Sequence, residues 1–126
     1  TMHAAWFDLG AALAGTHRAP VLTPDGSLEP GSTVGLDLAS PLGDSSFTLI
    51  VGISAINAPF KGGTLVPFPS LLIFGLPTGP GGGITLTGTW PGSLPSNVAF
   101  YFQEWIVDPA GPAGLAATNA VKAVTP

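Results

Sequence analysis

The sequence predicts an all-β fold: an antiparallel β-sandwich, immunoglobulin-like or jelly-roll-like, with about eight strands and an extended apolar N-terminal arm. Two features of the composition indicate it. The 126 residues include 18 glycines and 14 prolines, a high content of turn-forming residues, and 45% of the chain is nevertheless hydrophobic. Disordered chains lack so large a hydrophobic fraction, so the combination indicates many short strands joined by tight turns. The length fits a single domain.

The first strands are marked by apolar residues between clusters of turn residues. A strand at 19–23 precedes a Pro-Asp-Gly turn, and residues 34–38 alternate between aliphatic and small or acidic side chains, as in a half-buried strand. Residues 46–54 are almost continuously apolar and rich in β-branched side chains, which is typical of a central strand. After a loop dense in glycine and proline, we expect a short edge strand at 64–69 and a further strand at 70–76.

The second half of the chain predicts three more strands. A glycine-rich loop at 78–83 leads into a strand at 84–90, where threonine at alternate positions is typical of one wet face. The longest strand, 97–108, forms a long hairpin with 115–124 and is apolar on both of its faces. Because a two-layer sandwich covers only one face of a strand, we expect additional cover there, supplied by the N-terminal arm of this chain or of another copy.

The N-terminal segment is predicted to be an arm, residues 1–15, that precedes a β-sandwich domain, residues 16–126. The arm carries large apolar side chains without a regular period. An apolar arm that lacks a clear place in its own fold can add a strand to a neighbouring copy. We therefore take its large apolar side chains as a candidate assembly interface: Trp6, Phe7, Leu9 and Leu13.

Charged side chains are unusually few, at 8% of the residues, with three basic against seven acidic residues and a net charge of −4. Three scattered cations cannot form a basic patch, which excludes nucleic acids and anionic membrane surfaces as partners. The apolar runs are too short for membrane insertion. A surface with so few charges has two interpretations. Either it is covered by other subunits, by a parent chain or by sugar, or the chain is a secreted domain rich in serine, threonine and glycine. Cysteine is absent, so disulfides and thiol chemistry are excluded.

No pattern in the sequence is typical of catalysis or of metal binding. His3 and His17 have only Asp8 as a nearby acid and are predicted to be solvated or merely polar linker residues. Glu104 lies within a predicted strand and has no identifiable partner for glycoside hydrolysis. The glycine-rich loop is not followed by Lys-Ser or Lys-Thr, and neither a nucleophile elbow nor a calcium-loop spacing occurs. We predict that the protein is not an enzyme and has no catalytic residue, metal site or cofactor.

Three aromatic residues allow two interpretations. Trp90, Tyr101 and Trp105 could form a flat surface on which sugar rings stack, and Tyr101 and Trp105 share one face of the predicted strand at 97–108. The alternative is that these aromatic side chains pack in the core and under a loop or a neighbour. The second interpretation is favoured because both faces of that strand are apolar.

Two separated motifs carry a resemblance to a known type of domain. Residues 57–65 read Asn-Ala-Pro-Phe-Lys-Gly-Gly-Thr-Leu, and residues 101–114 read Tyr-Phe-Gln-Glu-Trp-Ile-Val-Asp-Pro-Ala-Gly-Pro-Ala-Gly. From 15 to 126 the chain resembles a small Gly/Pro-rich domain found near the C-termini of predicted secreted bacterial proteins. The resemblance implies export and a β-rich module, and it implies no activity, substrate or catalytic residue.

These observations predict an extracellular or cell-surface structural subunit that self-assembles into a filament or surface layer, by exchange of its N-terminal arm with a neighbouring copy. The expected partner is then another copy of the chain. One alternative is a carbohydrate-binding or adhesive module with a polysaccharide partner. A second alternative is a passive spacer or sorting domain of a larger secreted protein.

Overall fold

The structure is a computed structural model that describes residues 5–126. Over that range it consists of eleven β-strands without a helix, which confirms the predicted all-β sandwich. The strands are β1 (Ala5–Gly10), β2 (Val21–Asp25), β3 (Thr33–Ala39), β4 (Ser46–Gly52), β5 (Ala55–Phe60), β6 (Gly63–Pro67), β7 (Leu71–Pro77), β8 (Gly83–Thr89), β9 (Ala99–Val107), β10 (Leu115–Ala117) and β11 (Ala120–Val124).

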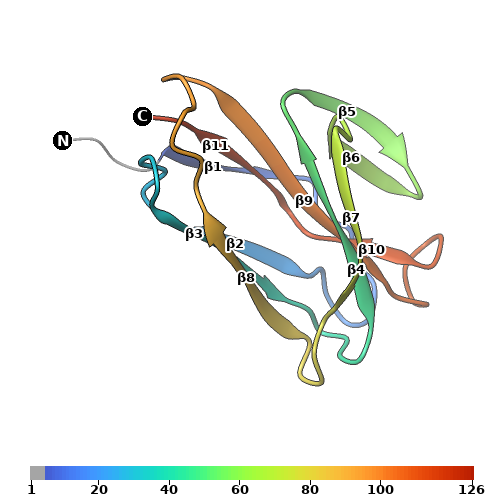
Figure 1. The fold of residues 1–126 in the computed structure, drawn as a ribbon. Coiled ribbons are helices and arrows are strands. Elements are labelled where there is room, and N and C mark those ends of the chain that lie inside the picture. The colour runs from blue at the N-terminus through green and yellow to red at the C-terminus, as the bar shows by residue number, and fades with distance from the viewer. Residues whose placement is uncertain (1–4) are drawn as a thin grey trace.

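The strands form two facing sheets and a separate hairpin. The main sheet has the order β1-β11-β9-β4-β7, with β10 also paired to β9, and the small sheet has the order β2-β3-β8. All of these pairs are antiparallel. The third unit is the two-stranded hairpin β5-β6. Figure 1 shows the two sheets as layers, with the hairpin on the far side of the main sheet from the small sheet.

The core lies between the two sheets. Leu22, Leu36 and Leu38 of the small sheet face a row of buried side chains of the main sheet that includes Phe102 and Ile106. The alternation at 34–38 and one apolar face of the long strand predicted this arrangement, because residues two apart in a strand point to the same side. These residues therefore form the first of two apolar layers.

The other face of β9 is covered by the β5-β6 hairpin. Trp105 is 3% exposed, and its ring meets that of Phe60 edge to face with 5.2 Å between centroids. Leu13 and Leu65 complete this second cluster. Gly63 allows the close approach, since a Cβ atom there would lie 3.2 Å from the Trp105 ring. The expected additional cover is present, but most of it comes from the hairpin, and the arm contributes only Leu13.

The hairpin exists because of the turn at its tip. Lys61 and Gly62 have positive φ angles of 50° and 86°, and Phe60 pairs with Gly63 directly after them. Positive φ at both central residues is the requirement of a type I′ turn, whose twist matches that of the flanking strands. The segment before this turn was expected to be a loop, and it forms β5 instead.

Gln103 joins the hairpin to the main sheet. Its Oε1 atom accepts hydrogen bonds from the Val66 backbone N–H (3.1 Å) and from the Trp105 indole N–H (3.1 Å). Its Nε2 atom donates to the carbonyl oxygens of Thr64 and Thr118, both at 3.2 Å. All hydrogen-bonding positions of this buried amide are therefore used, and they tie strand β6 and the segment between β10 and β11 to β9.

The N-terminal arm folds back on its own chain. Residues 5–10 form β1, the edge strand beside β11, and Trp6 packs against Phe102 with 6.0 Å between ring centroids. The Trp6 indole N–H also donates to the carbonyl oxygen of Gly26 at 3.0 Å. The arm was expected to cover the apolar face of β9, either in its own chain or in another copy. In this structure it extends the main sheet instead, because its backbone pairs with β11 and Trp6 adds to the core.

The predicted strand at 115–124 is divided into β10 and β11 at Thr118 and Asn119. The Asn119 side chain turns toward β2, where it accepts from the Leu22 N–H (2.8 Å) and donates to the Leu22 carbonyl (3.0 Å). It also donates to Asp8 at 3.1 Å. This side chain thereby bonds the main sheet to the small one at the break. With β1 and β5, the division accounts for eleven strands where about eight were expected.

Candidate assembly surface

Strand β7 is a free edge of the main sheet. It pairs on one side with β4, Ile73 lying opposite Leu49, and no other strand within residues 5–126 pairs with it. Its sequence, Leu-Leu-Ile-Phe-Gly-Leu-Pro, contains no charged or hydrogen-bonding side chain. A bulge near Gly75, where φ is +70°, shifts the register and leaves residues 71–74 as the regular part of the edge. An uncovered edge strand presents unpaired backbone N–H and C=O groups to a partner.

Large apolar side chains gather on and beside this edge. Phe74 is 70% exposed, and Leu71 is 52% exposed. The hairpin residue Phe60 and the end of β9 extend the same surface, since they line one groove together with Leu72 and Phe74. We define the β7 patch as the exposed apolar residues of this region: Phe60, Leu71, Leu72, Ile73, Phe74 and Val107.

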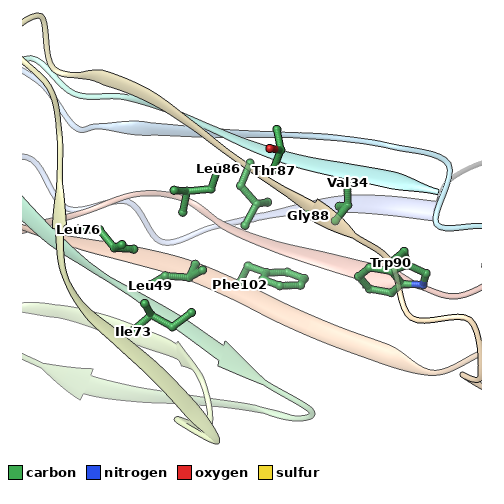
Figure 2. Close-up of a pocket in the computed structure, with 10 residues that line it drawn as sticks. Val34, Leu49, Ile73, Leu76, Leu86, Thr87, Gly88, Trp90 and Phe102 are labelled. Carbon is green, nitrogen blue, oxygen red and sulfur yellow. The ribbon is translucent and has the colours of Figure 1, made fainter. Parts of the chain in front are cut away.

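Two apolar hollows flank β7, one on each face of the main sheet. On the outer face a groove of about 360 Å³ lies between the hairpin and β7, and Ile50 and Trp105 contribute to its lining beside Leu72 and Phe74. On the inner face a cavity of about 300 Å³ lies between the two sheets. Figure 2 shows the side chain of Ile73 beside that cavity. Successive side chains of β7 therefore line the groove and the cavity in turn, and both hollows are apolar.

The cavity has walls from both sheets. Leu49 and Phe102 of the main sheet face Val34 and Leu86 of the small sheet across it, and Trp90 stands at one end (Figure 2). Thr87, the one lining residue with a hydroxyl group, points its side chain away from the hollow (Figure 2). A hollow of this composition offers contact area to apolar groups and very little hydrogen bonding.

The four arm residues proposed from the sequence lie in different environments. Trp6 belongs to the core, and Leu13 lies in the cluster under the hairpin. Phe7 and Leu9 are exposed on β1, where the Lys122 ammonium lies 5.9 Å from the Phe7 ring centroid. The structure therefore does not bring the four together in one surface. The residues of β7 were present in the sequence as an apolar run, but nothing in a run of that kind distinguishes an edge strand from a buried one.

The three aromatic residues proposed for sugar stacking are separated as well. Trp90 is 6% exposed and packs in the core edge to face with Phe100, whereas Trp105 is buried on the opposite face of the main sheet. Tyr101 is half-buried, with Lys122 Nζ at 5.7 Å from its ring centroid. Neither tryptophan presents its ring face to solvent, so the three do not form one stacking platform.

Glu104 is the most unusual polar residue of the core. It is 0% exposed, and neither of its carboxyl oxygens has a hydrogen-bond partner among the described residues. Burial, together with the negative charge of Asp37, raises the pKa of Glu104 from 4.5 to about 8. The carboxyl group is therefore protonated at neutral pH, which avoids the large cost of a buried unpaired charge.

Asp108 shows the opposite behaviour at the end of β9. Burial acts to raise the pKa of Asp108, but hydrogen bonds from the Thr16 backbone N–H and hydroxyl and from the Ala110 N–H outweigh it and lower the pKa. The carboxylate thereby ties the segment after β1 to the turn that follows β9. The Pro-Phe-Lys-Gly-Gly turn reaches the same region, since a Cβ atom on Gly62 would lie 2.8 Å from Pro112. Both sequence motifs thus have structural roles.

Residues 5–126 do not bring together three or more His, Cys, Asp or Glu side chains that could hold a metal ion. Over the same range, no helix is long and apolar enough to cross a membrane. His17 is exposed with a φ of +66°, and His3 lies outside the described residues.

Comparison with protein families, with curated proteins and with solved structures found no match for this chain.

Proposed function

We propose that this domain is a structural module of an extracellular protein and that its task is to associate with other copies of itself. The observation that carries the proposal is the exposed, uncharged edge strand β7 with the apolar patch around it. The extracellular location rests on the resemblance of the two sequence motifs to domains of secreted bacterial proteins.

The residues at the other sheet edges support this proposal, because those edge strands carry polar or charged side chains or proline and β7 does not over residues 71–74. Free edges in monomeric proteins are commonly blunted by charged residues or proline. The edge strand β2 contains Pro24 and Asp25, and β1 contains Asp8 and an irregularity before Gly10. Edge strand β8 is not charged, but its threonines give it a polar outer face. Residues 71–74 have none of these features, which favours a covered edge in the working assembly.

The extent of the apolar surface supports it too. A fully exposed aromatic side chain presents about 150–250 Å², so the β7 patch exposes on the order of 500 Å² of apolar area. The largest apolar patch of a typical monomer is about 300–600 Å² and is often a site of interaction. A chain with only 8% charged residues also has little electrostatic repulsion to keep copies apart.

Of the two alternatives, the carbohydrate-binding module receives less support, because Trp90 and Trp105 are buried. The passive spacer differs from our proposal in its solution behaviour and not in its fold, since it predicts a monomer without a partner.

Sedimentation equilibrium of the purified chain tests the proposal. We expect reversible association at micromolar concentrations, and we expect it to persist at high salt because the contact is apolar. A chain that remains monomeric up to millimolar concentration would contradict self-association and would favour the spacer.

A further inference from the structure

We infer that the partner of β7 is the same strand of a second copy, paired antiparallel across a two-fold axis to form a closed dimer. This inference rests on the proposed function and specifies the surface and the symmetry of the association. In such a dimer the two main sheets become one continuous sheet, and each β7 is an internal strand.

The strand complements itself in one register. With the axis at Ile73, Leu72 of each copy lies opposite Phe74 of the other, on the outer face of the joined sheet. Aromatic–aliphatic pairs of this kind stabilise antiparallel sheets. Moving the axis to Leu72 places Phe74 opposite Ser70 and gives up these pairs. Moving it to Phe74 places Ile73 opposite Gly75 and brings the bulge next to the axis. In the Ile73 register the bulge lies only at the outermost pair, Leu71 with Gly75, so this register is the one that keeps the Leu72–Phe74 pairs.

The area is sufficient for a specific dimer. Because an isologous contact uses the same patch twice, two β7 patches remove on the order of 1,000 Å² of apolar surface from water, which is about the lower limit for a biological interface. The outer groove adds to this, since it lies beside Leu72 and Phe74 and is open to side chains of the second copy. The backbone hydrogen bonds between the two strands come in addition.

The composition of the surface favours a second copy over a different partner. The patch has no charge through which a charged partner could be selected, and an apolar strand is best matched by another apolar strand. The opposite edge of the main sheet, β1, carries Asp8, and a two-fold pairing there would bring two Asp8 carboxylates close together. The sheet therefore joins through β7 only, which gives a dimer and not an open filament.

Disulfide trapping tests the geometry, because the chain has no cysteine of its own and an introduced thiol is unique. Directly opposed residues of antiparallel strands have Cα atoms about 4.5–5.5 Å apart, within the range of about 4.4–6.8 Å that a disulfide spans. We expect Ile73→Cys to form a covalent dimer under mild oxidation. The matched control is Phe7→Cys on β1, an exposed edge position that should remain largely unlinked.

A second pair of variants does not depend on disulfide geometry. Phe74→Lys should weaken dimerisation at least about tenfold, because each copy would bury an unpaired ammonium group, whereas Phe7→Lys should leave it unchanged. Both positions are exposed, and circular dichroism and thermal unfolding check that both variants fold. If the wild-type chain associates but Ile73→Cys does not cross-link and Phe74→Lys associates normally, the β7 dimer is wrong and self-association through another surface stands. If the wild-type chain does not associate, both proposals fail.

Discussion

Two adjacent residues of β9 are completely buried, on opposite faces of the main sheet. They differ in the hydrogen bonds that their side chains make. Gln103 makes hydrogen bonds with every polar atom of its amide and so joins the hairpin to the sheet. The side chain of Glu104 points into the sandwich, and its carboxyl group has no hydrogen-bond partner within the described structure. A satisfied buried amide stabilises a fold and fixes its geometry, while a buried carboxyl group without partners lowers stability.

Glu104 makes the stability of the domain depend on pH. Below pH 4.5 its carboxyl group is protonated in both the folded and the unfolded chain. Between 4.5 and about 8 only the unfolded chain loses the proton, so the free energy of unfolding falls as the pH rises. The expected slope approaches 1.4 kcal/mol per pH unit, roughly 5 kcal/mol in all, and the dependence ends above pH 8.

Replacing Glu104 with glutamine should remove this loss. We expect Glu104→Gln to unfold at a higher urea concentration than wild type at pH 8 and at a similar one at pH 4.5. The control is Glu29→Gln, because Glu29 is exposed. If the free energy of unfolding depended on pH equally in the wild type and in Glu104→Gln, the Glu104 carboxyl group would not be the source of that dependence.

At the scale of the elements, local pattern predicted strands better than it predicted their partners. The strands around residues 34–38, 46–52 and 99–107 were found because apolar alternation, β-branched residues and turn residues are local signals. β5 was missed because its asparagine and proline, and the two glycines that follow it, indicate a loop, although two positive φ angles at the turn make a hairpin. The pairing of β1 with β11 was missed because pairing between the two ends of a chain leaves no local pattern.

The place of β1 can be tested with Trp6→Ala. If β1 belongs to its own sandwich, the substitution removes the contact with Phe102 and the hydrogen bond to Gly26, and the free energy of unfolding should fall by about 2–4 kcal/mol. Association of the folded variant should remain as in wild type. Urea unfolding and sedimentation together measure both effects. If Trp6→Ala had the stability of wild type but no longer associated, the result would instead support exchange of the arm between copies.

At the scale of the whole molecule, the sequence predicted the fold class and the need for a third layer over β9, and it did not predict which surface is left open. Low charge and surplus apolar residues indicated an assembling module, but the arm was chosen as its interface because it lacked a visible partner. The folded chain pairs the arm and leaves β7 exposed. Which strand lies at an edge depends on the order of all strands in the sheet, and no single segment contains that information.

Amide hydrogen exchange of β7 tests the central claim, that a second copy covers this edge. In an antiparallel strand alternate amides point away from the existing neighbour, so within residues 71–74 those facing away from β4 are open in a monomer. We expect their exchange to slow as the concentration of the chain rises, and to stay fast in Phe74→Lys at every concentration. Fast exchange of these amides in wild-type chain that is fully associated would contradict the claim.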